Sequence, residues 1–140
     1  RSQLIKKGKL ANKIDKNYVI ILDGAHNASG AKALSKVLSS IDTEWQLIFG
    51  YLKTRKPIEF LNELKSITQK IITTEITGQE NCFSSKELFE IIQKKGIPVN
   101  KSKNLYEAIE IASQNKLNVC ICGSLYLAGE FLKNNQTIPN

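Results

Sequence analysis

The chain has 140 residues, of which 41% are hydrophobic and 24% are charged. This size and balance are typical of one globular domain with a single buried core, so we expect one domain over residues 1–140. The sequence contains no apolar run as long as a membrane span and no recognisable signal peptide. These features argue against a membrane partner, and we expect a cytoplasmic location.

The formal net charge of +7 raises the question of a nucleic-acid partner. The lysines are scattered between separate segments, and no aromatic residues alternate with them as in single-strand binders. We therefore expect solvated surface lysines and no nucleic-acid partner. Representative positions are Lys6, Lys16, Lys36, Lys53, Lys70, Lys94, Lys103 and Lys116.

The three cysteines, Cys82, Cys120 and Cys122, fit no metal-ligand spacing. Cys120 and Cys122 alternate within one apolar run, so we expect reduced thiols on one buried sheet face. We predict no metal site in the chain. The sequence contains no Met and begins with Arg1, and we expect it to be part of a longer protein.

Residues 1–17 are basic and loosely patterned, which predicts an irregular lead-in or an edge strand. Residues 19–22 are uniformly apolar, as in a parallel strand covered on both faces. A polar loop follows, and then a helix over 29–40. We expect its apolar face to contain Leu34, Val37, Leu38 and Ile41.

A second strand over 45–49 ends at Gly50, and a polar loop leads to Pro57, which suits the first turn of a helix. Residues 70–74 predict a third strand, followed by a polar surface loop. The residues expected on the inner face of the intervening helix are Phe60, Leu61 and Leu64.

Ser84 and Glu87 have the spacing of a capping box, and Phe83 with Leu88 has that of a hydrophobic staple. A helix is therefore predicted to begin at Ser84 and to end before Gly96. A brief strand over 97–100 is expected next.

Asn104 is predicted to cap the next helix, and residues 119–122 form a fully apolar strand that ends at Gly123-Ser124. A final helix follows, before the polar tail 134–140. The residues predicted to point inward from this helix are Leu125, Ala128, Phe131 and Leu132.

Strands and helices alternate almost throughout, which predicts an α/β fold with a mostly parallel sheet covered by helices on both faces. Right-handed crossovers then place the loops at Asp23, Gly50, Thr74 and Gly123 along one edge of the sheet. Ligands of open α/β sheets bind outside the carboxyl ends of the strands. We therefore expect the functional residues at this edge.

His26 is the only histidine and the only side chain with an unperturbed pKa near neutrality. After a buried strand and beside Asp23, it could bind an anion or move a proton. The alternative is a loop histidine that only hydrogen-bonds the backbone. Asp23 could accept hydrogen bonds from a ribose or ammonium group, or stabilise the turn before Gly24.

Asn27 and Ser124 each precede a predicted helix, where they could cap it, contact a ligand or do both. Arg55 and Lys56 add positive charge at the same edge, although such loop residues are usually solvated. The sequence has no GxGxxG fingerprint, no GxxxxGK[ST] loop and no nucleophile elbow. The chain by itself therefore has no evident phosphate cradle for ATP.

Three segments at strand ends carry a family resemblance: Ile-Ile-Leu-Asp-Gly-Ala-His-Asn at 20–27, Phe-Gly-Tyr-Leu at 49–52 and Gly-Ser-Leu-Tyr-Leu-Ala-Gly-Glu at 123–130. Together they resemble the C-terminal domain of folylpolyglutamate synthase/dihydrofolate synthase, in the Mur ligase superfamily. The opening Arg1-Ser2-Gln3 is similar to the family's Arg-Leu-Gln segment. The resemblance covers nearly the whole chain and implies a Rossmann-like three-layer domain.

The resemblance implies an ATP-dependent, ADP-forming ligase that joins L-glutamate to a folate or dihydropteroate carboxylate through an acyl phosphate. It also implies a partner, the N-terminal P-loop domain of the same polypeptide, which supplies most of the Mg²⁺ ligands. We expect a monomer, inactive without that domain. By resemblance, Arg1, Asp23 and Asn27 are nucleotide contacts, while His26 and Ser124 lie near the glutamate, with His26 as the catalytic residue.

Two departures from the family are visible. Ala28 replaces the proline that usually follows Asn27, and Arg55-Lys56 stands where a Lys-Asp pair is usual. The alternatives are the C-terminal domain of a peptidoglycan Mur ligase, or a non-catalytic relic or binding domain.

Overall fold

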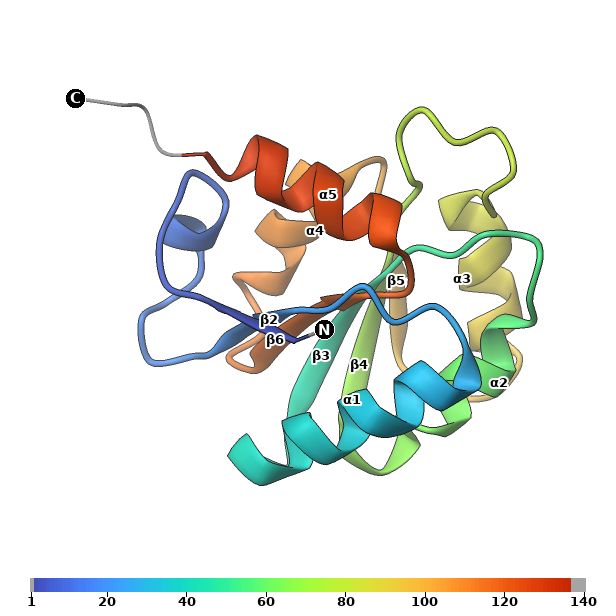
Figure 1. Ribbon diagram of the computed structural model, residues 1–140, viewed down its shortest axis with the longest axis horizontal. Coiled ribbons are helices and arrows are strands. Elements are labelled where there is room, and N and C mark those ends of the chain that lie inside the picture. The colour runs from blue at the N-terminus through green and yellow to red at the C-terminus, as the bar shows by residue number, and fades with distance from the viewer. Residues whose placement is uncertain (1, 137–140) are drawn as a thin grey trace.

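The computed structural model describes residues 2–136. Within this range the strands form one sheet, and the helices lie on its two faces (Figure 1). The strands are β1 (Gln3–Ile5), β2 (Ile20–Leu22), β3 (Trp45–Phe49), β4 (Thr68–Thr73), β5 (Val99–Lys101) and β6 (Asn118–Cys122). The helices are α1 (Ala28–Ile41), α2 (Pro57–Asn62), α3 (Ser85–Gln93), α4 (Leu105–Ala112) and α5 (Leu125–Asn134), with 3₁₀ turns η1 (Ala11–Lys13) and η2 (Lys65–Ile67).

The strand order is β1-β2-β6-β3-β4-β5. All neighbouring pairs are parallel except β1 and β2, which are antiparallel. The edge-strand alternative for the opening segment is thus confirmed. The predicted α/β class, with its mostly parallel sheet, is also confirmed.

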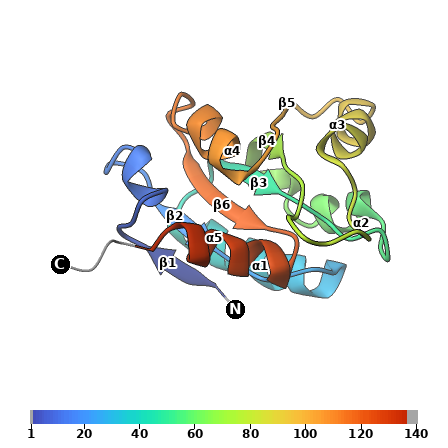
Figure 2. The ribbon, with the colours of Figure 1, turned by 90° about the horizontal axis from the view of Figure 1, so that it is seen from above.

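Two separate cores show that the sheet is covered on both faces. Alternate residues of one strand point to opposite sides: Ile21 packs with α1, α2 and α3, whereas Ile20 and Leu22 pack with α4 and α5. Figure 2 shows the sheet from above, with α5 and α1 at different depths. Cys120 and Cys122 lie together in the core under α1 to α3, as predicted.

The three cysteines are free of disulfides, and burial raises the pKa of the Cys120 thiol well above its usual value. The thiol is therefore protonated at neutral pH and behaves as a small apolar group in the core.

The capping predictions are confirmed at atomic level. Ser84 Oγ accepts a hydrogen bond from the Glu87 N–H at 3.0 Å, and Glu87 accepts one from the Ser84 N–H at 2.8 Å. Asn104 caps α4 through the Glu107 N–H at 2.8 Å. These local bonds fix where the helices begin, and so which residues face the sheet.

Four residues predicted on inner helix faces are instead exposed. On α1, Leu34 and Leu38 are buried, but Val37 and Ile41 are 37% and 45% exposed. Val37 lies at the margin of the buried face, and Ile41 is the last residue of the helix. On α5 the exposed fractions are 64% for Leu125 and 42% for Leu132. Leu125 is the first residue of α5, and its side chain lies over Gly24.

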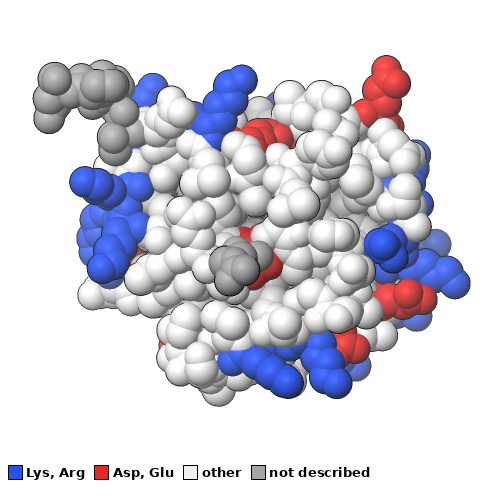
Figure 3. Space-filling view, in the orientation of Figure 1, with Lys and Arg blue, Asp and Glu red and all other residues white. Residues whose placement is uncertain are grey.

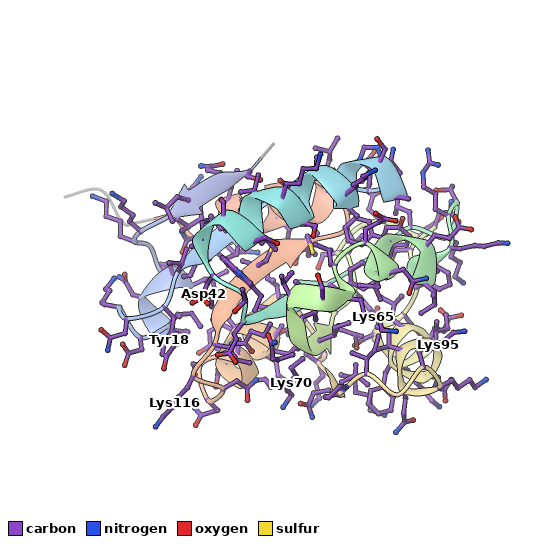
Figure 4. The ribbon with its side chains drawn as sticks, turned by 90° about the horizontal axis from the view of Figure 1, so that it is seen from below. Tyr18, Asp42, Lys65, Lys70, Lys95 and Lys116 are labelled. Carbon is purple, nitrogen blue, oxygen red and sulfur yellow. The ribbon has the colours of Figure 1, made fainter. Side chains whose placement is uncertain are left out.

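The edge opposite to the predicted site carries lysines on several separate elements. Figure 4 views this side, where Lys65, Lys70, Lys95 and Lys116 are spread out along the molecule, with Asp42 in the same region. The positive charge here is distributed between elements, as the sequence predicted. No helix within residues 2–136 has the length and apolar character needed to cross a membrane.

Candidate functional site

The loops after β2, β3, β4 and β6 meet at the carboxyl edge of the sheet, as predicted. The Asp23 N–H donates to Ile121 O at 3.0 Å, and the Gly123 N–H donates to Ala25 O at 3.1 Å. The Thr74 N–H donates to Phe49 O at 3.0 Å. These backbone bonds tie neighbouring loops together and bring residues distant in sequence to one place.

Asp23 lies at the end of β2 and is 5% exposed. One carboxylate oxygen accepts a hydrogen bond from the Ala25 N–H at 2.7 Å, and the other accepts one from the Ser2 hydroxyl at 2.5 Å. The turn-stabilising role considered from the sequence is therefore present. The carboxylate also links the first residues of the described chain to the loop that carries His26.

His26 is exposed and lies in the loop between β2 and α1. Its Nδ1 is 3.1 Å from Gly24 O. Because a carbonyl oxygen only accepts, we assign the proton of the neutral imidazole to Nδ1, which leaves the Nε2 lone pair available. The backbone-bonding alternative and a ligand role for Nε2 are therefore compatible.

Asn27 and Ser124 cap the two helices that begin at this edge. Asn27 Oδ1 accepts a hydrogen bond from the Gly30 N–H at 2.8 Å, and α1 begins at Ala28 directly after this cap. Ser124 is 2% exposed, and its Oγ accepts from the Tyr126 N–H at 3.0 Å. Because Oγ acts as the acceptor, the hydroxyl proton of Ser124 remains available to donate.

Two hollows adjoin each other at His26 and Leu125, which line both. One has a volume of about 380 Å³. Its other lining residues are Ser2, Asp23, Gly24, Ala25, Asn27, Gly30, Ala33, Leu34 and Val37. The second has a volume of about 230 Å³. Its other lining residues are Tyr51, Leu52, Thr54, Arg55, Gly123, Ser124 and Tyr126.

The two hollows differ in their chemistry. The first contains the Asp23 carboxylate and, on its α1 side, apolar side chains. In the second, Arg55 is the charged side chain, and Ser124, the N-cap residue of α5, lines the same hollow. A cation and a helix N-terminus both favour a negatively charged ligand, so the second hollow is suited to an anionic group.

Tyr51 is a site residue that the sequence analysis did not select. Its ring is 2% exposed, and its hydroxyl donates to the His26 carbonyl oxygen at 2.9 Å. Burial raises the pKa of Tyr51 to about 12; the nearby Arg55 acts in the opposite direction, and Glu59 adds to the rise. The position directly after a strand and Gly50 is the sequence signal that could have identified it.

The surface formed by β1, α1 and α5 is mostly uncharged. Figure 3 shows the face crossed by β1, α1 and α5, where Lys and Arg gather toward the margins and the centre is largely white. At the second hollow, Leu125 and Tyr126 are 64% and 55% exposed. Leu125 and Tyr126 therefore form a pair of exposed apolar side chains at this hollow.

The predicted nucleotide contact Arg1 lies outside the described residues. Within residues 2–136, no group of three or more His, Cys, Asp and Glu side chains could hold a metal ion. The donor set in this part of the chain therefore does not fit a Mg²⁺ site.

A parallel sheet with loop-lined hollows at its carboxyl edge is the architecture of an α/β ligand-binding domain. Residues 6–134 match the family described as the C-terminal domain of dihydrofolate synthetase. The chain belongs to this family. No curated protein sequence gave a significant match.

Solved structures of folate synthases share the fold. Mycobacterium tuberculosis folylpolyglutamate synthase, complexed with ADP and AMPPCP, has 21% identity and a TM-score of 0.75; the match covers 87% of this chain and 30% of that one. Escherichia coli FolC, complexed with DHPP and ADP, has 17% identity and a TM-score of 0.74, with 94% and 30% covered.

A third structure is a bifunctional folylpolyglutamate synthase/dihydrofolate synthase with Mn, AMPPNP and L-glutamate bound. It has 19% identity and a TM-score of 0.69, with 94% of this chain and 30% of that one covered. The chain thus spans about 30% of the length of the structures it matches.

Proposed function

We propose that the chain is the C-terminal domain of an ATP-dependent ligase that joins L-glutamate to a folate or dihydropteroate carboxylate. The observation that carries this proposal is the pair of hollows that meet at His26, one containing a carboxylate and the other lined by hydroxyl groups and Arg55. Two different ligands can therefore approach the same imidazole. The family match and the ligands named for the solved relatives support this assignment.

The reaction has two steps. The pterin substrate's carboxylate oxygen attacks the γ-phosphorus of ATP, and ADP leaves as the acyl phosphate forms. The glutamate nitrogen then attacks the acyl carbon, an amide bond forms, inorganic phosphate leaves and the nitrogen loses a proton. Both steps develop negative charge on oxygen, so oriented donors accelerate them.

The first hollow is the proposed place for part of the nucleotide. Asp23 offers carboxylate oxygens that could accept from ribose hydroxyls, and the Asn27 amide group, whose oxygen caps α1, has N–H donors available for phosphate. The apolar α1 side could cover a base or ribose. The remaining phosphate contacts and most of the Mg²⁺ ligands are assigned to a P-loop domain of the same polypeptide, while Arg1 of this chain is proposed as a further contact to phosphate.

The second hollow is the proposed place for glutamate. Ser124 can donate its hydroxyl proton to a carboxylate or phosphate oxygen, and the first turn of α5 adds a favourable dipole. His26 lines both hollows. In this position it could stabilise the tetrahedral intermediate when protonated or accept a proton from the attacking nitrogen when neutral.

The closing partner is proposed to be that N-terminal domain. The exposed Leu125 and Tyr126 beside the second hollow would become buried when the two domains close over ATP. Closure would also exclude water from the acyl phosphate, which hydrolyses readily. The isolated chain is therefore proposed to be inactive.

The test is an assay of ADP release by the complete polypeptide that contains this domain. Release that requires both a pterin carboxylate substrate and L-glutamate is expected. Release that requires a peptidoglycan precursor would assign the domain to another Mur ligase. Absence of any ADP release from a folded polypeptide with an intact P-loop would support the non-catalytic alternative.

A further inference from the structure

We propose that Tyr51 is a positioning residue, whose hydroxyl holds the backbone of the His26 loop so that the imidazole stays at the boundary between the two hollows. This inference rests on the proposed function of His26. It concerns a hydrogen bond between two loops that follow different strands, Tyr51 after β3 and His26 after β2.

The hydroxyl of Tyr51 is held in a fixed place by aromatic packing. The rings of Tyr51 and Phe49 are stacked with centroids 5.1 Å apart, and Phe60 of α2 lies 5.4 Å from each of them. All three residues are at most 2% exposed. A ring clamped on two sides has few alternative rotamers, so its hydroxyl is a rigid donor.

The bond acts on the orientation of the imidazole. Tyr51 binds the His26 carbonyl oxygen, while the imidazole Nδ1 faces Gly24 O at 3.1 Å. The side chain and backbone of His26 are therefore held to two different groups. Loss of the Tyr51 bond frees the His26 peptide to rotate, and the contact of Nδ1 with Gly24 O is then no longer enforced.

The Tyr51 hydroxyl also keeps its proton over the pH range in which an enzyme works. Because burial keeps the pKa of Tyr51 near 12, the phenol is protonated at neutral pH and can only donate toward a carbonyl oxygen. The tyrosine lines the second hollow as well. Its hydroxyl is thus near the ligand site but already occupied by the loop.

Tyr51→Phe removes the hydroxyl and keeps the three packed rings. Tyr18→Phe is the matched control, since Tyr18 lies on the opposite side of the molecule (Figure 4) and loses the same atom. The measurement uses the 140-residue chain, in which the single histidine gives one set of imidazole nitrogen signals by NMR.

Wild type and Tyr18→Phe are expected to show mainly the Nδ1–H tautomer at a pH where the ring is neutral. Tyr51→Phe is expected to lose this preference, and the amides of residues 25–30 should exchange with solvent at least ~10-fold faster because the loop opens locally. A purely structural role would lower the melting temperature without changing the tautomer. An unchanged tautomer and unchanged exchange rates in Tyr51→Phe would overturn the proposal.

The complete polypeptide separates this inference from the proposed function. There Tyr51→Phe is expected to lower kcat by ~10-fold while leaving the KM for ATP unchanged. If the His26 tautomer changes in Tyr51→Phe but His26→Ala retains full activity, the proposed function of His26 fails and the positioning by Tyr51 stands. If His26→Ala is inactive but Tyr51→Phe leaves both tautomer and kcat unchanged, the positioning inference fails alone.

Discussion

Gly123 packs so closely against Gly50 that a methyl group on its Cα would overlap the Gly50 carbonyl oxygen. The two glycines follow the neighbouring strands β6 and β3, and Gly123 has a φ of 114°. The absence of a side chain at this position lets the backbone of the two loops approach. The second hollow is built on this approach, since Gly123 and Ser124 line it.

Gly123→Ala is therefore expected to destabilise the chain by at least ~2 kcal/mol, from backbone strain and overlap together. Gly129→Ala is the matched control: it lies inside α5 with no atom within 4 Å of the added methyl group. It should stabilise the chain by ~0.5–1 kcal/mol. Urea unfolding, monitored by the fluorescence of the buried Trp45, measures the unfolding free energy of both variants. Equal unfolding free energies for Gly123→Ala and Gly129→Ala would contradict this account.

Ser124→Ala is expected to lose the cap of α5, at a cost of ~1 kcal/mol, and to raise the KM for glutamate by ~10-fold or more in the complete polypeptide. Ser84→Ala removes the cap of α3 at a similar cost, but Ser84 does not line either hollow. Its KM for glutamate should stay within about twofold of wild type. A similar rise in both variants would mean that Ser124 acts through stability alone.

His26→Ala is expected to abolish glutamate addition, with a fall in kcat of ~10²-fold or more. The side chain is exposed and its removal opens no cavity, so the unfolding free energy should change by less than ~0.5 kcal/mol. Steady-state kinetics with glutamate and thermal unfolding are measured on the same preparation. Near-normal turnover would rule out a direct role for this imidazole.

Alkaline pH should weaken the fold through Tyr51. The pKa of Tyr51 is raised by burial from 10.0 to about 12, so the folded state favours the neutral phenol. This stabilisation is fully present below pH 10 and is lost as the pH rises through about 12. The difference in unfolding free energy between wild type and Tyr51→Phe should shrink by ~1–3 kcal/mol across this window.

The measurement is a series of urea unfolding curves from pH 8 to pH 11.5, and the comparison with Tyr51→Phe cancels the common effect of lysine deprotonation. A constant difference between wild type and Tyr51→Phe over this range would contradict the assignment of Tyr51 as a buried, neutral donor.

Much of the fold was predictable because its signals are local. The apolar runs 19–22 and 119–122 and the mostly apolar run 45–49 define strands buried on both faces. The caps at Ser84, Asn104 and Ser124 mark where helices begin. The position of a loop after such a strand predicts the functional edge. The sequence alone therefore selects Asp23, His26 and Ser124 as candidate site residues.

The exposure of particular helix residues was less predictable. Leu125 and Leu132 satisfy the apolar spacing of α5, yet both are exposed, since the outcome depends on where the helix ends relative to the sheet edge. The spacing of apolar residues predicts the buried face of a helix to within about one residue. It carries no information on how far the sheet beneath the helix extends. The same reason explains Val37 and Ile41 on α1.

The sequence by itself determined the class of fold, the edge at which the polar loops gather and the family resemblance, because strand periodicity, caps and motifs are contained in consecutive residues. Only the tertiary structure decided that two hollows meet at His26 in the candidate site, and that Tyr51 donates a hydrogen bond to the His26 carbonyl from another loop. Such a contact joins residues 25 positions apart. It depends on the order and register of strands that pair across the sheet, which no local pattern encodes.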